Sequence, residues 1–181
     1  MLLETDRLIL RRFRAGDAPV LAAYRSDPDV ARYQSWDAPF SLGDAIAFVA
    51  EAARLDPGRE GWFQYAVEAR ETGELVGDVG VNRGDGGRQA ELGFTLAPEH
   101  QGRGYATEAV RRIVDFLLVE EGLHRVRATL DARNERSARL LERLGFRREG
   151  LCVQAGRWKG EWTDDLLYAV LASEWSRSSE R

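Results

Sequence analysis

The chain has 181 residues, 44% of them hydrophobic and 31% charged, and its formal net charge at pH 7 is −4. This length suits one domain with a full hydrophobic core, and the acidic balance argues against a nucleic-acid partner that requires a broad basic surface. A single cysteine, Cys152, excludes an internal disulfide, and two histidines are too few for a Cys/His zinc cluster. We therefore expect no metal site, no nucleic-acid partner and a reducing, cytoplasmic location.

The first third of the chain predicts a strand followed by helices. Residues 5–14 alternate as in a strand, so we expect no apolar leader there. Asp17, Asp27 and Ser41 are of the types that cap helices, and each precedes a stretch that suits a helix. No apolar run approaches the roughly 20 residues of a membrane-spanning helix, and we expect no membrane association.

The remaining elements follow from changes of period along the chain. Three segments with period two and short turns predict an antiparallel meander, after which helical and strand-like spacing alternate. The expected elements are strands over residues 62–69, 75–81 and 90–96, a helix over 104–121, a strand over 125–130, a helix over 135–144, and strands over 146–157 and 163–171. This order predicts an α+β fold in one domain, residues 1–172, followed by a polar tail, residues 173–181.

The segment between the meander and the next helix is rich in glycine and reads QGRGYA at residues 101–106. The first turn of a helix presents N–H groups without partners and the positive end of the macrodipole, which favour an anion. Gly102 and Gly104 remove side chains that would keep a ligand from the backbone, so the segment predicts a phosphate site, with Arg103 and Thr107 as further donors. A glycine-assisted entry to a core helix is the alternative interpretation.

Two common phosphate-binding motifs are excluded. A nucleotide-triphosphate loop ends in Gly-Lys-Ser or Gly-Lys-Thr, and neither tripeptide occurs in the chain. A dinucleotide fingerprint follows the first strand of a parallel βαβ unit, whereas this segment follows an antiparallel meander. The predicted anion site therefore belongs to another class of ligand.

Three motifs, in order, resemble the GNAT N-acetyltransferase superfamily. Residues 101–106 resemble its Q/R-x-x-G-x-G/A motif for the acyl-CoA pyrophosphate, and ELGFTL at 91–96 resembles the strand before it. Asn134 ahead of LLERLGF at 140–146 resembles the second motif, and TDRLILR at 5–11 is similar to the RimJ/RimL-like branch. The resemblance implies a GNAT-type mixed, mostly antiparallel central sheet with a splayed strand pair, flanked by helices.

The resemblance also implies acetyl-CoA as the donor, held between the two central strands, and direct transfer to an amine. By position, the glycine-rich segment would bind the pyrophosphate, the strand before it would pair with the pantetheine arm, and a backbone N–H near Leu96 would polarise the thioester. Core packing for the strand residues and helix capping for Asn134 remain alternative roles. The implied donor-binding residues are Phe94, Thr95, Leu96, Gln101, Gly102, Arg103, Gly104, Tyr105, Ala106, Thr107 and Asn134.

The catalytic residues depart from the family pattern. Many GNAT proteins carry a proton-donating tyrosine where this chain has Leu141. RimL-like proteins lack this tyrosine and use a serine that corresponds to Ser137. RimL-like proteins are also thought to use a glutamate where this chain has Gly156. We therefore expect Ser137 to donate a proton and Glu91 to act as the base through water. The rival bases are Glu161 and Asp164.

Aromatic side chains beside carboxylates suit a cationic amine, and the chain places both in its early helices and its last turn. The expected acceptor-binding residues are Tyr33, Trp36, Trp158 and Glu161. The tryptophans would equally suit a core or a dimer contact, so a monomer and a homodimer both remain open. The leading expectation for the acceptor is a protein N-terminus of the ribosomal-protein type. The alternatives are a small amine such as an aminoglycoside or polyamine, a succinyl-CoA donor, and a non-catalytic acyl-CoA sensor.

Overall fold

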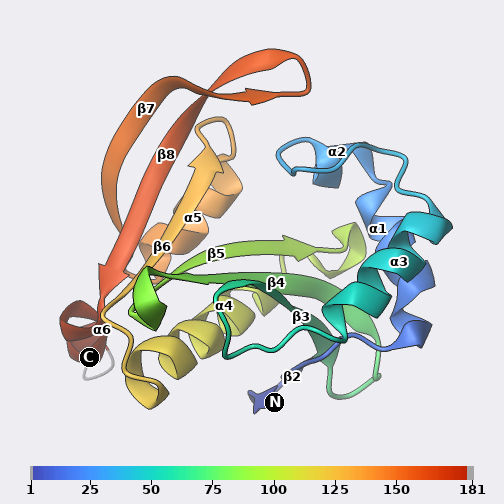
Figure 1. The fold of residues 1–181 in the computed structure, drawn as a ribbon, viewed down its shortest axis with the longest axis horizontal. Helices are drawn as coiled ribbons and strands as arrows, with labels where there is room; N and C mark the ends of the chain where they lie inside the picture. The colour runs from blue at the N-terminus through green and yellow to red at the C-terminus, as the bar shows by residue number, and fades with distance from the viewer. Residues whose placement is uncertain (1, 179–181) are drawn as a thin grey trace.

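One sheet runs through the computed structural model, which describes residues 2–178 (Figure 1). Its eight strands within those residues lie in the order β1-β2-β3-β4-β5-β6-β8-β7, and only β5 and β6 are parallel neighbours. This arrangement confirms the predicted mixed, mostly antiparallel sheet. The strands are β1 Leu3–Glu4, β2 Leu8–Arg11, β3 Gly61–Ala69, β4 Leu75–Gly84, β5 Gln89–Leu96, β6 Arg125–Asp131, β7 Arg147–Trp158 and β8 Glu161–Leu171.

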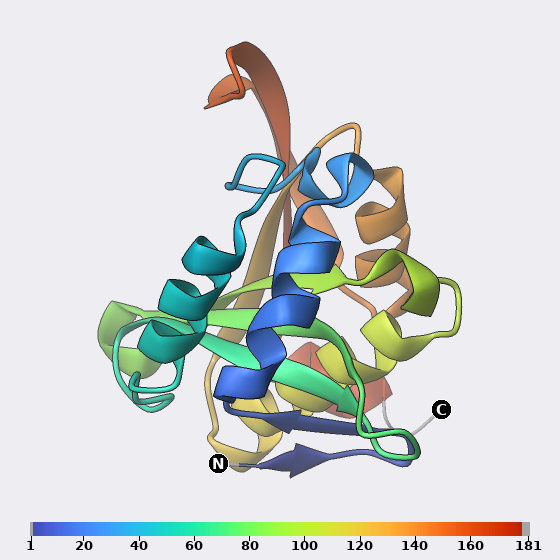
Figure 2. The same ribbon diagram turned by 90° about the vertical axis from the view of Figure 1, so that its right-hand side faces the viewer.

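Helices cover both faces of the sheet. The buried apolar stripe of α4 and the buried residues of α5 share one core with the central strands, as their helical spacing predicts. The side-by-side helices α1 and α3 pack on the opposite face (Figures 1 and 2). None of the helices in the described part of the chain has the length and apolar character that a membrane crossing requires. The helices are α1 Ala18–Arg25, α2 Pro28–Ala31, α3 Leu42–Ala52, α4 Tyr105–Asp115, α5 Glu135–Arg143 and α6 Ala172–Ser178.

The parallel strands β5 and β6 are joined over only a short stretch. Their registered pairs end at Glu91 and Arg127, although β5 continues to Leu96 and β6 to Asp131. The two central strands therefore separate after Glu91, which confirms the splayed pair. The free end of β5 leads directly into the glycine-rich segment and α4, so the split and the predicted anion site lie next to each other.

Asp17 does not cap α1 with its side chain, contrary to the sequence expectation. Its carboxylate accepts hydrogen bonds from Arg11 Nη1 and Nη2, at 2.7 and 2.8 Å, and from the Arg14 N–H at 2.7 Å. Both Asp17 and Arg11 are buried, and a buried charge requires such a partner. Asp27 and Ser41 do cap their helices, α2 and α3, through their side chains.

Two boundaries differ from the sequence expectation. The helix expected over residues 104–121 consists of α4 and a π-helical turn, Phe116–Glu120. The expected polar tail from residue 173 starts as a helix, because α6 extends over Ala172–Ser178 and Trp175 is buried. The Trp175 Nε1 donates to Asp115 at 2.6 Å, so the ring is buried with its polar group satisfied. Residues 179–181 lie outside the described residues.

Candidate active site

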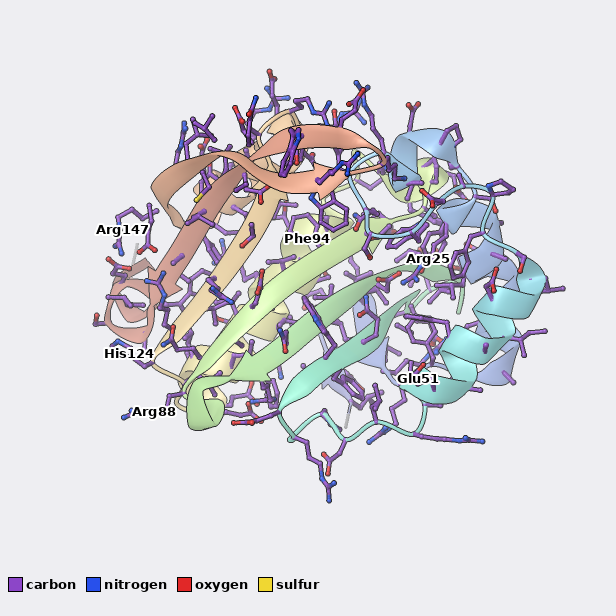
Figure 3. All side chains as sticks on the ribbon, turned by 45° about the horizontal axis from the view of Figure 1, so that its top comes forward. Arg25, Glu51, Arg88, Phe94, His124 and Arg147 are labelled. Carbon is purple, nitrogen blue, oxygen red and sulfur yellow. The ribbon has the colours of Figure 1, made fainter. Side chains whose placement is uncertain are left out.

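A cleft of about 1130 Å³ lies along the free end of β5. Four parts of the chain line it: residues 6–7, the α2 region, the end of β5 with the segment that leads into α4, and α5. Phe94, labelled in Figure 3, is one of the lining residues and projects from β5 in the middle of the molecule. The fold therefore brings the two main sequence motifs to one cleft, although they are separated by several elements along the chain.

Most of the predicted site residues line this cleft, and a smaller group lies outside it. The lining residues are Tyr33, Phe94, Thr95, Leu96, Gln101, Gly102, Gly104, Tyr105, Ala106, Thr107, Asn134 and Ser137. The predicted residues outside the lining are Arg103, Glu91, Trp36, Trp158 and Glu161.

The glycine-rich segment has the backbone that an anion site requires. Gly102 and Gly104 have φ values of 76° and 82°, in the left-handed region that strains an L side chain. Gly104 immediately precedes α4, and no side chain caps the first turn of this helix. The N–H groups of that turn are therefore not taken by a capping residue, and they lie beside the cleft with the positive end of the helix dipole.

The backbone of β5 turns into the split at the residues expected to meet the donor. The Ala97 N–H donates to the Val76 carbonyl oxygen on the β4 side, at 3.0 Å. Backbone groups alternate in direction along a strand, so those of Leu96 and Phe94 point away from β4 and into the split. The Gln101 Nε2 donates to the Leu96 carbonyl oxygen at 3.1 Å. The Leu96 N–H and the backbone groups of Phe94 are left to face a ligand in the split.

The first turn of α5 forms the opposite wall. Asn134 caps this helix, since its Oδ1 accepts the Ser137 N–H at 3.2 Å. The half-buried Ser137 lines the cleft, and its hydroxyl has no hydrogen-bond partner in the described part of the chain. Leu141, at the family's tyrosine position, is fully buried in the core. The side-chain hydroxyl that lines the cleft on this wall is therefore that of Ser137.

The cleft lining is rich in arginine although the whole chain is acidic. Arginine is the preferred partner of phosphate groups, so this surplus fits a donor that carries a pyrophosphate. Among the described residues, no group of three or more His, Cys, Asp or Glu could hold a metal ion. Seven arginines, Arg7, Arg32, Arg111, Arg133, Arg136, Arg139 and Arg143, line the cleft with four carboxylates, Asp6, Asp29, Glu108 and Glu135.

Arg133 connects Tyr33 and Glu161, two of the residues predicted to bind the acceptor. The Tyr33 hydroxyl donates to the Arg133 carbonyl oxygen at 3.3 Å, and Arg133 Nη1 lies 3.3 Å from Glu161 Oε2. Burial raises the pKa of Asp131, but its hydrogen bonds from Arg133 outweigh burial and hold that pKa below its ordinary value. Glu161 does not line the cleft itself, but it forms an ion pair with Arg133, which does.

Trp36 and Trp158 lie outside the cleft lining. The Trp36 ring stacks on the buried Arg25 guanidinium at 4.2 Å, and its Nε1 donates to the Arg25 carbonyl oxygen at 3.0 Å, which secures the early helices. Trp158 ends β7, and beside it the Lys159 Nζ donates to the carbonyl oxygens of Ala31 and Trp36, at 2.7 and 2.9 Å. The tip of the β7–β8 hairpin is therefore tied to the α2 region.

Glu91 lies in a separate hollow of about 260 Å³ and accepts a hydrogen bond from Arg127 Nη2 at 3.0 Å. Alternation along β5 puts Glu91, Gly93 and Thr95 on one face of the sheet, and Thr95 lines the main cleft. A Cβ at Gly93 would meet nothing within 4 Å, so this face is open between the two hollows. Glu91 stands where the strands begin to separate, about 13 Å along β5 from Thr95.

Several residues in or beside the cleft were not singled out for a role from the sequence, among them Arg7 and Arg133 in its lining and Lys159 beside it. Arg7 belongs to the TDRLILR motif, which carried a resemblance but no function. The hydrogen bonds from Lys159 to Ala31 and from Tyr33 to Arg133 join residues 128 and 100 positions apart. Local spacing contains no signal for such partners.

Comparison with known proteins agrees with the fold. The acetyltransferase (GNAT) domain family matches residues 7–147. The uncharacterized N-acetyltransferase YoaA of Bacillus subtilis (strain 168) is 34% identical over 171 residues, 94% of this chain and 96% of YoaA. A solved GNAT-family acetyltransferase from Bacillus anthracis has a TM-score of 0.87 at 30% identity, covering 96% of this chain and all of that one (100%). The ribosomal protein uS5-alanine N-acetyltransferase of Escherichia coli (strain K12) is 25% identical, covering 96% of this chain and 92% of that enzyme.

A splayed central strand pair that leads into a glycine-rich helix start defines an acyltransferase cleft. The chain belongs to the GNAT acetyltransferase family, and it is an N-acetyltransferase of that family. GNAT acetyltransferases use acetyl-CoA as the co-substrate, and the positive cleft with its exposed helix N-terminus suits that donor.

Proposed function

We propose that this enzyme transfers the acetyl group of acetyl-CoA to the α-amine of a protein N-terminus, in the manner of a ribosomal-protein acetyltransferase. The observation that carries the proposal is the nearly end-to-end match to the uS5-alanine enzyme, which covers 96% of this chain and 92% of that one. In this proposal, Tyr33 and Glu161 contact the acceptor at the edge of the cleft, where Arg133 joins them.

The chemistry of the amine also favours an N-terminus. An α-amine has an ordinary pKa near 8, whereas a lysine or polyamine amine has one above about 10. An α-amine therefore arrives partly neutral at pH 7 and demands less of the enzyme's base. That matches this site, because the candidate base Glu91 lies about 13 Å along β5 from Thr95 and reaches the reaction through water.

In the proposed complex, the donor lies along the free end of β5. The N–H groups at the start of α4 bind the pyrophosphate, and the backbone of Phe94 and Leu96 pairs with the pantetheine arm. The Leu96 N–H polarises the thioester carbonyl. Because Asn134 Oδ1 is used to cap α5, its Nδ2 is the group that donates to the donor from the opposite wall.

The proposed reaction is a direct displacement. The amine nitrogen bonds to the thioester carbon, the C–S bond breaks, and the products are an amide and CoA. The amine proton leaves through water toward Glu91, and Ser137 supplies a proton to the departing thiolate. Glu91 stands on β5 where the two strands begin to separate, and Ser137 lines the cleft from α5, so the two proton transfers use groups on different elements.

The first test is CoA release with acetyl-CoA and a panel of amines. Peptides that begin with alanine or serine should release CoA well above hydrolysis, and the same peptides with a blocked N-terminus should not. Aminoglycosides, polyamines and a parallel series with succinyl-CoA complete the panel. The blocked peptide is the matched control, because it differs from the substrate only at the reacting nitrogen.

Other results would assign the enzyme elsewhere. Faster turnover of polyamines or aminoglycosides would contradict the N-terminal acceptor and support the small-amine alternative. A preference for succinyl-CoA would point to a carboxylate-binding role for Arg32 and Arg133. CoA binding in calorimetry without turnover of any amine would support a sensor domain.

Glu91→Gln is expected to lower kcat about a hundredfold, with a KM for acetyl-CoA close to that of the wild type, because general-base catalysis contributes roughly this much. The measurement is kcat and the two KM values, for the peptide and for acetyl-CoA, at one fixed pH. Arg127→Gln is the matched control, since it breaks the same ion pair and leaves the carboxylate. It should keep kcat. An equal loss of kcat in both variants would show that the ion pair matters and not the basicity of Glu91, and would contradict its role as the base.

A further inference from the structure

Residues 5–7 follow β1 and belong to the TDRLILR motif at residues 5–11. The proposed reaction gives this motif no role. In the fold, this segment lies against the glycine-rich segment and the first turn of α4, although 96 to 103 positions separate the bonded residues. Asp6 and Arg7 also line the cleft. The segment is therefore part of the donor end of the site.

Arg7 holds the glycine-rich segment at several points. Its Nη1 donates to the Arg103 carbonyl oxygen at 3.0 Å, and its guanidinium lies 4.8 Å from the centre of the Tyr105 ring. Its Nη2 lies 3.3 Å from the position that a Cβ on Gly104 would take. A segment whose N–H groups bind an anion must turn its carbonyl groups elsewhere, and Arg7 receives one of them.

Glu108 is the second partner of Arg7, and its position creates an electrostatic problem. It lies in the first turn of α4 and lines the cleft, where a carboxylate would repel a bound phosphate. Arg7 Nε and Nη2 lie 2.7 and 2.5 Å from Glu108 Oε2. The Thr5 hydroxyl and the Arg7 N–H donate to Glu108 Oε1, at 2.5 and 3.1 Å. Both carboxylate oxygens are therefore occupied.

Glu108 remains ionised in this arrangement. Burial raises the pKa of its carboxyl group, but hydrogen bonds from Thr5 and Arg7 outweigh burial and leave that pKa below its ordinary value. Without Arg7, the negative charge would stand unneutralised at the helix N-terminus, beside the place where the donor's phosphates bind. The same loss would release the Arg103 carbonyl group.

We infer that Arg7 is a positioning residue for the donor site, which neutralises Glu108 and holds the Arg103 carbonyl group so that the pyrophosphate segment is formed before acyl-CoA binds. This inference rests on the proposed binding of the pyrophosphate by residues 101–107. It gives the TDRLILR motif a physical role, because threonine and arginine of that motif supply the contacts to Glu108.

The test compares two acyl donors. Arg7→Ala should raise the KM for acetyl-CoA about twentyfold and change kcat less than threefold. With S-acetyl-pantetheine, which has no pyrophosphate, kcat/KM should match that of the wild type. Arg7→Lys should give an intermediate KM, because one ammonium group cannot hold both partners as the planar guanidinium does. Adding Glu108→Gln to Arg7→Ala should recover part of the lost affinity by removing the unpaired charge.

Arg70→Ala is the matched control. Arg70 binds the same N-terminal segment, through Glu4 and the Thr5 carbonyl oxygen at 2.8 and 3.0 Å, but not the glycine-rich segment. It should leave the KM for acetyl-CoA unchanged. Equal losses with both donors in Arg7→Ala would show a general folding role and overturn the inference, as would unchanged CoA affinity in calorimetry. Absence of CoA binding by the wild type would instead overturn the proposed pyrophosphate site.

Discussion

Gly104→Glu is expected to weaken CoA binding by at least about a hundredfold, or ~2.8 kcal/mol. The new carboxylate would stand at the start of α4, where the pyrophosphate is proposed to bind, and would repel it. The left-handed φ of 82° also strains any side chain at this position, by roughly 1–2 kcal/mol. Calorimetric titration with CoA measures the effect directly.

Gly122→Glu separates these two contributions. Gly122 also has a left-handed φ, 73°, and a Cβ there would meet nothing within 4 Å, but it lies outside the cleft lining. Its variant should lose a similar amount of stability and bind CoA as the wild type does. Wild-type affinity in Gly104→Glu would refute the assignment of the pyrophosphate to residues 101–107. An equal loss of CoA affinity in both variants would show that backbone strain, and not repulsion of the pyrophosphate, causes the effect.

Ser137→Ala is expected to lower kcat about a hundredfold and to change CoA affinity less than threefold. Proton donation to the departing thiolate occurs only as the C–S bond breaks, so its loss affects the rate and not ground-state binding. The Asn134 cap uses the Ser137 backbone N–H and not its hydroxyl, so the start of α5 should survive the substitution. Steady-state rates and calorimetry with CoA measure the two quantities separately.

Ser137→Thr is the conservative control for this prediction. It keeps a hydroxyl group at the same point of the first helical turn and should retain most of the rate. A Ser137→Ala enzyme with wild-type kcat would remove Ser137 from the mechanism and leave proton donation to water. A parallel fall of kcat and CoA affinity would indicate a role in binding.

Much of the fold could be predicted because its signals are local, and the signals behind the proposed donor end of the site are local as well. Alternation along the strands, helical spacing in α4 and the caps Asp27 and Ser41 depend on residues a few positions apart. The glycine-rich segment is equally local, because an anion site at a helix start needs only the backbone of that start. Asp17 is an exception to this local prediction. Its residue type predicted a helix cap, but its carboxylate accepts hydrogen bonds from Arg11 instead.

The acceptor end could not be predicted to the same degree. Tyr33 lines the cleft, but Trp36 packs on Arg25 and Glu161 is held by Arg133. Aromatic and acidic residue types in the sequence therefore did not specify which of these side chains line the cleft. That choice depends on how the α2 region and the β7–β8 hairpin approach each other.

By itself the sequence determined most of the order and type of the elements and the resemblance to the family, and it predicted an anion site at the start of α4, because each of these signals lies within one or two elements. Only the tertiary structure decided that Glu91 lies in a separate hollow and that Arg7 lies against Glu108 and Arg103. The physical reason is that these arrangements depend on which sheet face each helix covers and on contacts between residues about 100 positions apart, for which local periodicity carries no information.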